Sequence, residues 1–138
     1  MLFRSRFADR YVPRALHRDL TVSEVPLREL AQVIRSKNAG PFELTFDIIF
    51  DRKAAYEEVK ASGALTAEKL ARLYNIPLDD VLVAMFFDPA MAFKMTVKRR
   101  WQQGSSNERD TFGAAQHAPL MDIMIPSRAN LRTSDPAA

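Results

Sequence analysis

The sequence predicts an α+β fold, a ferredoxin-like sandwich in which a mainly antiparallel sheet carries its helices on one face. Two observations carry this prediction. Short apolar runs with strand-like patterns are separated by segments whose apolar residues have helical spacing. The order of these segments is strand, strand, two helices, strand, helix, strand. That order is typical of the ferredoxin-like fold, with one helix doubled.

The first half of the domain supplies two strands and two helices. LRELAQVI begins the folded part, and we expect a strand from about Glu29 to Arg35. A second strand, Glu43 to Phe50, alternates along ELTFDIIF, so that one of its faces is apolar and the other carries polar groups. Asp51 is the expected N-cap of a helix over residues 52–61, and Thr66 is the N-cap of the next helix.

The second half supplies the remaining strands and one helix. VLVAMFF, from Val81 to Phe87, is continuously apolar, which predicts a central strand buried on both faces of the sheet. Asp88-Pro89 combines an N-cap carboxylate with proline at the first helical position, so a helix is predicted from Pro89 to about Trp101. Within that segment FKMTVK also alternates as a strand does. The last strand is expected from Leu120 to Ile125.

Length and composition predict one domain, over residues 27–126 of the 138. An arginine-rich extension, 1–26, precedes it, and a disordered tail, 127–138, follows. The favoured interpretation of the extension is a surface arm or a partly disordered segment, and a short helix from about Ala15 to Leu20 is the alternative. The absence of cysteine excludes disulfides and thiolate metal sites. No apolar run approaches the roughly 20 residues that span a bilayer, and the start has no secretory character. We therefore expect a cytoplasmic protein without a membrane segment.

The strongest candidate for a binding site is the polar stretch RSKNAG. Its guanidinium, ammonium, hydroxyl and amide groups, together with free backbone N–H groups of a turn, can hold a carboxylate or phosphate. The stretch contributes Arg35, Ser36, Lys37 and Asn38. The alternative is a charged, solvated turn between two strands. In the strand that follows, Thr45 and Asp47 share a face.

Two further groups could carry chemistry. One surrounds the predicted helix start and contains Asp88, Lys94, Thr96 and Arg99, although an ordinary basic helix face is the favoured interpretation of it. The other contains Asp110, Gln116 and His117, the only histidine inside the predicted domain. Histidine near a carboxylate can transfer protons near neutral pH, whereas the alternative is a histidine that bonds its own loop. A triad of Ser105, His117 and Asp110 has no nucleophile-elbow motif behind it.

Several long stretches together resemble one family. IRSKNAGPFELTFDIIFD, LARLYNIPLDDV, FFDPAMAFKMTVKR and RDTFGAAQHAPLMDIMIP are similar to the proteins grouped as domain of unknown function 4387. The resemblance covers about residues 27–126. Ala115 stands where the family usually has glutamine, so a role for that position is in doubt here. The resemblance implies association with large proteins of the acyclic-terpene-utilisation family, and it is consistent with a ferredoxin-like domain.

The expected function is that of a small subunit or accessory domain of a two-component catabolic enzyme. Such an enzyme would act on an organic acid or acyl-CoA, by hydration or dehydration. The alternative is a non-catalytic, homo-oligomeric binding or regulatory module. Nucleic-acid binding is least favoured because aromatic residues do not alternate with the basic ones. No cofactor and no metal site are predicted, since the domain has no second histidine and no ligand spacing of a known type.

The residues assigned to this function fall into two groups. The candidates for proton transfer are His117 and Asp47. The candidates for binding a small anionic ligand are Arg35, Ser36, Lys37, Asn38, Thr45, Lys94, Thr96, Arg99 and Gln116.

Overall fold

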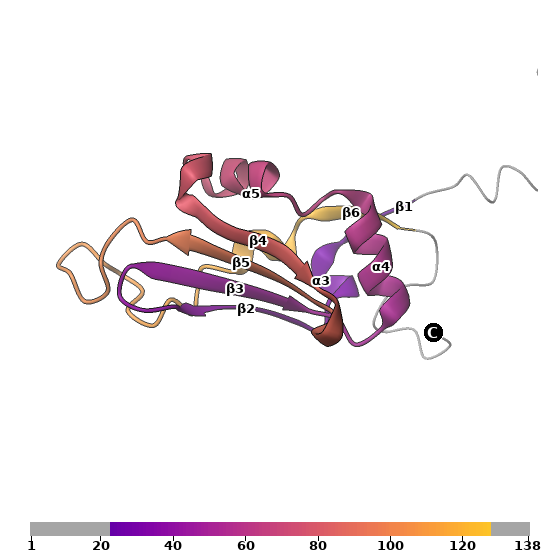
Figure 1. Ribbon diagram of the computed structural model, residues 1–138, viewed down its shortest axis with the longest axis horizontal. Helices are drawn as coiled ribbons and strands as arrows, with labels where there is room; N and C mark the ends of the chain where they lie inside the picture. Colours follow the sequence, from indigo (N-terminus) through magenta and orange to yellow (C-terminus); the bar gives the residue numbers. More distant parts are fainter. Residues whose placement is uncertain (1–22, 128–138) are drawn as a thin grey trace, which may run out of the picture.

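The computed structural model describes residues 23–127, an α+β fold with two antiparallel sheets and short helices (Figure 1). The larger sheet has the order β2-β3-β5-β4, and the smaller pairs β1 with β6. The strands are β1 (Ser23–Pro26), β2 (Val33–Asn38), β3 (Glu43–Ile49), β4 (Val81–Phe87), β5 (Ala92–Lys98) and β6 (Met124–Ser127). The alternative helix over 15–20 and the tail from residue 128 lie outside the described residues.

Helices cover one face of the four-stranded sheet (Figure 1). They are α3 (Leu27–Leu30), α4 (Lys53–Ser62), α5 (Ala67–Tyr74) and α6 (Ala118–Met121). Aromatic contacts join the sheet to α4 and α5: the ring centroids of Phe46 and Tyr74 are 5.1 Å apart, and those of Phe86 and Tyr56 are 5.8 Å apart. The core therefore lies between this face and the helices, and the opposite face, which we call the open face, has no helix over it among the described residues.

Local sequence signals account for α4 and α5. The helix predicted over 52–61 is confirmed as α4, and it ends at Gly63, whose φ of 69° is a left-handed conformation that glycine adopts readily. The Thr66 hydroxyl accepts a hydrogen bond from the Lys69 N–H at 3.2 Å, as predicted for an N-cap. The prediction for Asp51 was wrong, because Arg52 occupies the N-cap position of α4 without a side-chain cap.

The helix predicted from Pro89 to Trp101 is strand β5. Asp88 and Pro89 begin only a single 3₁₀ turn, Asp88–Ala90, and Met91 ends it with a φ of 47°. The alternation then decides the structure, since Phe93, Met95 and Val97 are buried against the helices. A helix would have placed Phe93 and Val97 on one side and Met95 on the other, whereas a strand places all three on the same face.

Strand β4 lies at an edge of the sheet and is not the central strand that its apolar run predicted. Val83, Met85 and Phe87 are exposed on the open face, at 37%, 48% and 49%. The two central strands are β3 and β5. A continuous apolar run fits burial on both faces, but here one of those faces is not covered by any described residue.

At both ends of the domain the structure also differs from the elements that the sequence predicted. The strand predicted over 29–35 is the helical turn α3 followed by β2. The strand predicted over 120–125 is the turn α6 followed by β6, and β6 pairs with β1 rather than joining the large sheet. Because β1 begins at Ser23, the described fold starts four residues before the predicted boundary at 27.

Candidate functional site

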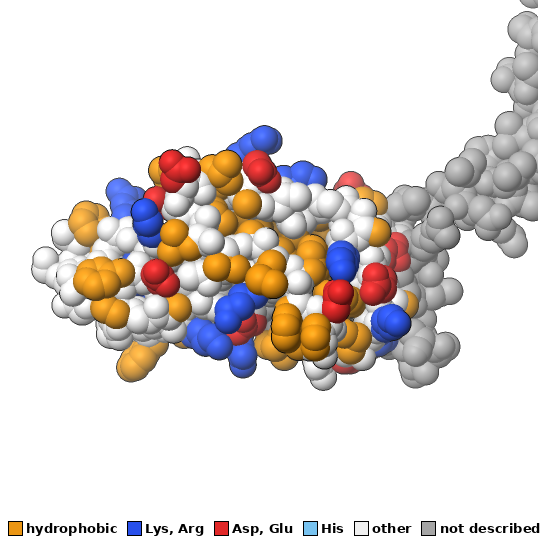
Figure 2. All heavy atoms as spheres, in the orientation of Figure 1, with side chains coloured by type: hydrophobic (Ala, Val, Ile, Leu, Met, Phe, Trp, Pro, Cys, Tyr) orange, Lys and Arg blue, Asp and Glu red, His pale blue; other side chains and the backbone are white. Residues whose placement is uncertain are grey.

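A hollow on the open face, the open-face pocket, brings together three cationic side chains, one carboxylate and an apolar wall. Its volume is about 370 Å³. Figure 2 shows Lys and Arg side chains gathered around an acidic one over the sheet, beside a hydrophobic patch. The residues that line it are Arg35, Lys37, Asp47, Ile49, Met85, Phe87, Ala90, Ala92 and Lys94.

Strand register places three of the four charged groups in one row across the sheet. Arg35 of β2 is opposite Asp47 of β3, and Asp47 is opposite Lys94 of β5. Met85 of β4 continues the row beside Lys94. Because alternate residues of a strand share a face, the neighbouring row on the same face is apolar and contains Ile49, Ala92 and Phe87.

Asp47 is the carboxylate at the centre of the pocket. Its Oδ2 atom is 3.0 Å from Arg35 Nε and 3.2 Å from Lys37 Nζ, and its side chain is only 13% exposed. Burial alone would raise the pKa of Asp47, but the hydrogen bonds and positive charges of Arg35 and Lys37 outweigh it and hold the pKa below its ordinary value. Asp47 is therefore ionised at neutral pH.

The positive charge of the pocket exceeds its negative charge by two. Arg35 contacts Asp47 through Nε alone, so its two terminal nitrogens remain available for another acceptor. Lys94 forms no ion pair with any described residue. The pocket can therefore accept an anion without displacing Asp47.

The two predicted binding threonines lie on the same open face, in the row next to the charged one. Thr45 and Thr96 are opposite each other on β3 and β5, and their hydroxyl oxygens are 3.1 Å apart. Both side chains are buried, and one of the two hydroxyls donates to the other. This bond joins β3 to β5 beside the pocket, and neither threonine lines the pocket.

Four other predicted binding residues hold the segment over residues 99–117, which we call the 99–117 loop. Ser36 accepts a hydrogen bond from the Gln116 N–H at 3.1 Å, and Asn38 donates to the Thr111 carbonyl at 2.7 Å. Arg99 donates to the Asn38 side chain and to the Asp110 carbonyl. Ser36 alternates with Arg35 and Lys37, so this loop is fastened to the side of the sheet opposite the open-face pocket.

The polar stretch RSKN is itself part of strand β2, and the turn begins only at Ala39. The predicted turn is therefore not built from these four residues, and it is through the side chains of Arg35 and Lys37 that the stretch reaches the open-face pocket. Of the predicted group around residue 88, Asp88 bonds Tyr56 and Lys60, and no described hydrogen bond or ion pair joins it to Lys94 or Arg99.

His117 lies at the N-cap position of α6, directly after the loop that Ser36 holds. Its Nδ1 atom is buried and has no hydrogen-bond partner among the described residues. Because Asp47 faces the opposite side of the sheet, the structure does not bring the two predicted proton-transfer residues together. The Asp110 carboxylate accepts from the backbone of Ala114 and Ala115 and from Gln116, and the described contacts include none with His117.

A second pocket, the loop pocket, lies under the 99–117 loop and has a volume of about 460 Å³. Its inner wall contains an ion pair between Arg99 and Glu108, 3.3 Å apart and almost fully buried. Sequence reasoning assigned Arg99 to a site but missed Arg100, Trp101, Glu108 and Arg109. The sequence does contain a signal for this pocket, namely three arginines and a tryptophan around one loop. The helix predicted from Pro89 to Trp101 obscured it, because it assigned Arg99, Arg100 and Trp101 to a helix and not to a loop.

No three His, Asp or Glu side chains of residues 23–127 group as metal ligands. None of the helices described there is long and apolar enough to cross a membrane.

The fold and the two pockets define a small α+β domain with a cationic hollow on an open sheet. Residues 27–124, more than half of the chain, match the family described as Domain of unknown function (DUF4387). The chain belongs to this family. Searches of curated proteins and of solved structures gave no match.

Proposed function

We propose that this domain is an accessory subunit of a two-component catabolic enzyme, and that it binds the organic acid or acyl-CoA on which the enzyme acts. The supporting observation is the open-face pocket, where Arg35, Lys37 and Lys94 surround a single carboxylate beside an apolar wall. An anion with an apolar tail matches both halves of this surface. Charged groups give orientation, and apolar burial gives most of the affinity.

The spacing of the two rows indicates how such an acid would lie. A carboxylate between Lys94 and the free nitrogens of Arg35 can form charge-assisted hydrogen bonds. The apolar row begins two residues further along each strand, about 7 Å away. A tail of a few carbons reaches Phe87 and Ile49 from that position.

An accessory role fits the positions of the titratable groups. Asp47 is held ionised by two cations, and His117 lies on the other side of the sheet. These residues therefore cannot share one substrate within a single subunit. We propose that a large partner of the acyclic-terpene-utilisation type supplies the remaining catalytic groups for a hydration or dehydration.

The edge strand β4 is our candidate for the contact with that partner. It is apolar along all seven residues, and its exposed side chains on the open face adjoin the pocket. Natural proteins usually protect such edges with charge, proline or a covering element. A partner strand that pairs with β4 would protect it and would bring catalytic groups next to the bound acid.

A panel of ligands tests the binding claim without knowledge of the partner. The purified protein is titrated with straight-chain carboxylic acids of increasing length and with the matching neutral amides, and its melting temperature is recorded. We expect stabilisation by the acids, increasing with tail length, and none by the amides. Equal effects of acid and amide would contradict a cationic site.

A non-catalytic homo-oligomer is the second candidate, and the same exposed β4 favours it. Two copies paired through this strand would form one continuous sheet. Affinity purification from the native lysate separates the candidates: recovery of one large protein in equal amount supports the accessory subunit, and recovery of the chain alone supports the homo-oligomer.

We also propose a ferredoxin-like ancestry for the four-stranded sheet. The order β2-β3-β5-β4, with α4 and α5 between β3 and β4, is that of a ferredoxin-like sheet whose first strand has moved behind the last. A solved structure whose strands follow this permuted order, and whose crossover from β3 through the helices to β4 has the usual handedness, would support the relationship to ferredoxin-like folds.

A further inference from the structure

The loop pocket contains cationic and aromatic groups that the proposed function does not use. Arg100 and Arg109 line it, and neither forms an ion pair with a described residue. Trp101 lines it too, is 44% exposed, and lies under the Arg100 guanidinium at 5.6 Å from the ring centroid. A planar ring can stack on tryptophan, and guanidinium groups suit phosphate.

The carboxylate of Glu108 adds a third feature to the pocket, an acceptor oxygen without a hydrogen-bond partner. Its Oε1 atom accepts from the Asp110 backbone and lies beside Arg99, but Oε2 is buried without a hydrogen-bond partner among the described residues. A buried acceptor of this kind is normally satisfied. Because Glu108 lines the pocket, a hydroxyl or amine that enters and turns this side chain can donate to it.

From these three features we infer that the loop pocket binds a nucleoside phosphate, with its base on Trp101, its phosphate on Arg100 and Arg109, and a donor group on Glu108. A ring, an anion and a hydrogen-bond donor in one small molecule define this class of ligand. The volume of about 460 Å³ is within the range of small-molecule sites. A free nucleotide and the nucleotide end of coenzyme A share this chemistry.

The wall of the pocket is held in place before any ligand arrives. Arg99 donates to the Trp101 carbonyl at 3.1 Å and to the Asp110 carbonyl at 3.0 Å. The Asp110 carboxylate receives three N–H groups, from Ala114, Ala115 and Gln116. The Asp110 carboxylate and the Glu108 Oε1 atom are therefore committed to internal donors, which leaves Glu108 Oε2 and the two free arginines to meet a ligand.

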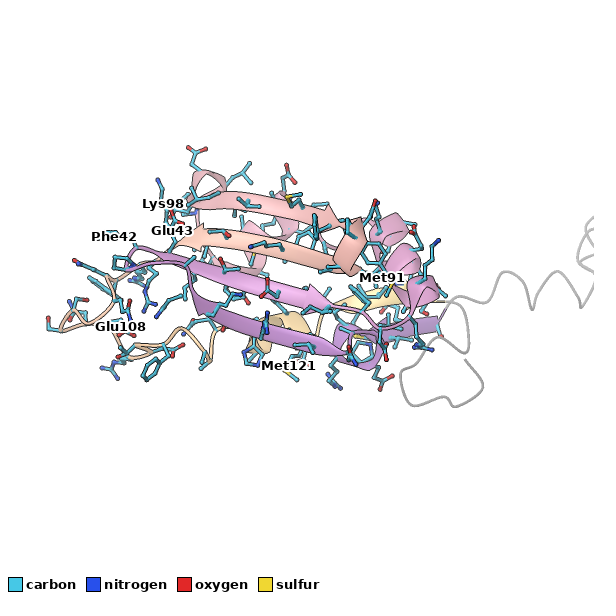
Figure 3. All side chains as sticks on the ribbon, turned by 60° about the horizontal axis from the view of Figure 1, so that its bottom comes forward. Phe42, Glu43, Met91, Lys98, Glu108 and Met121 are labelled. Carbon is cyan, nitrogen blue, oxygen red and sulfur yellow. The ribbon has the colours of Figure 1, made fainter. Side chains whose placement is uncertain are left out.

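This pocket is separate from the open-face pocket, so the inference does not rest on the proposed function. Figure 3 places Glu108 beyond the end of the sheet that carries Phe42, Glu43 and Lys98, whereas Met91 lies at the opposite end. Phe87, Ala90 and Ala92 of the open-face pocket are close to Met91 in the chain. The loss of one site should leave the other intact.

Trp101 is the only tryptophan of the chain, so its fluorescence reports directly on the loop pocket. The full chain is titrated with AMP, coenzyme A and inorganic phosphate, with excitation at the red edge of the tryptophan band. We expect saturable quenching by AMP, by coenzyme A or by both. Quenching by AMP identifies a free nucleotide as a ligand, and quenching by coenzyme A alone identifies the nucleotide end of that cofactor.

Two variants make the result specific. Arg109→Gln should weaken nucleotide binding about tenfold or more, since a charge-assisted contact is lost. Arg72→Gln, an exposed arginine on α5 away from the pocket, should bind as the native protein does. The inference is overturned if neither nucleotide quenches, if inorganic phosphate reproduces the whole effect, or if both variants bind with the native affinity.

Discussion

Asp47 balances the charges of the open-face pocket. It holds Arg35 and Lys37 at 3.0 and 3.2 Å and lies opposite Lys94 on β5. Without this carboxylate, three cations would repel one another on a partly buried surface. The same two neighbours that keep Asp47 ionised leave Lys94 and the outer nitrogens of Arg35 for a ligand.

The depressed pKa of Asp47 predicts a pH-dependent contribution to stability. Asp47→Asn should lower the free energy of unfolding by about 1–3 kcal/mol at neutral pH, because a charged hydrogen-bond acceptor is lost. A carboxylate whose pKa is lower in the folded protein stabilises above its ordinary pKa and loses that effect as the pH falls through the folded value. The gap between native protein and variant should therefore close in strong acid.

Urea denaturation at a series of pH values measures that gap. The native curve should approach that of Asp47→Asn only below the ordinary value of 3.8. A gap that stays constant down to the lowest pH would show that Asp47 acts through its shape and not its charge.

Thr45 and Thr96 offer a second test at this scale. Thr45→Val alone leaves the Thr96 hydroxyl buried without its partner, which costs about 1–3 kcal/mol. The double change to valine removes both hydroxyls and should recover most of that loss. A double-mutant cycle in urea measures the coupling, and strictly additive losses would contradict the mutual hydrogen bond.

At the scale of elements, the sequence predicted those whose signals were local and unopposed. Thr66 predicts a helix start, Gly63 predicts a helix end, and the apolar spacing of α4 predicts a helix, and no competing pattern opposes any of the three. The segment 89–101 carried two conflicting signals, and tertiary contacts decided between them. Its alternating residues pair with β3 and β4, contacts that no local pattern reveals.

The candidate site could be predicted only in part for the same reason. Arg35 and Asp47 lie on adjacent predicted strands and Lys37 in the predicted turn between them, so the sequence could place the three near one another. Lys94 joined them only because its segment is a strand. Ser36, Asn38 and Arg99 looked equally suited to an anion, but their partners in the 99–117 loop are distant in sequence.

The attachment of the 99–117 loop predicts a strong effect at Gly113. Its φ is 64°, and an added Cβ would overlap the Leu44 side chain and lie 2.7 Å from Asn38 Oδ1. Gly104 has a similar φ of 80° but nothing within 4 Å, so Gly104→Ala should show only the backbone strain, about 1 kcal/mol. Gly113→Ala should destabilise the domain further and change Trp101 fluorescence.

Thermal unfolding of the two variants side by side provides the comparison. Equal losses for Gly104→Ala and Gly113→Ala would mean that the loop does not pack against Leu44 and Asn38 as described.

At the scale of the whole molecule, the two faces of the large sheet have different roles. One face is covered by helices, and the other carries the cationic pocket and the exposed side chains of β4 (Figures 1 and 2). A chain that folds alone rarely leaves a seven-residue apolar strand at an edge. In the proposed assembly this asymmetry would connect the pocket to the partner, because the exposed Met85 and Phe87 of β4 also line the pocket.

A single charge on β4 should therefore prevent assembly without unfolding the domain. Val83→Lys places an ammonium on the exposed open face of the strand, where it remains hydrated in the free protein but would be buried in a paired sheet. If β4 contacts a partner, the yield of co-purified partner should fall at least tenfold. If β4 joins two copies of the chain, the molar mass of the assembly should revert to that of one chain. Glu68→Lys on exposed α5 is the control.

The most direct measurement for the central claim is calorimetric titration of a medium-chain carboxylic acid into two lysine variants. Lys94→Gln removes the unpaired cation of the open-face pocket, and Lys98→Gln removes a lysine on the same face of β5, about 13 Å further along. We expect the acid to bind the native protein and Lys98→Gln alike, and to bind Lys94→Gln at least tenfold more weakly. Equal affinities for all three proteins would contradict an anion site on the open face.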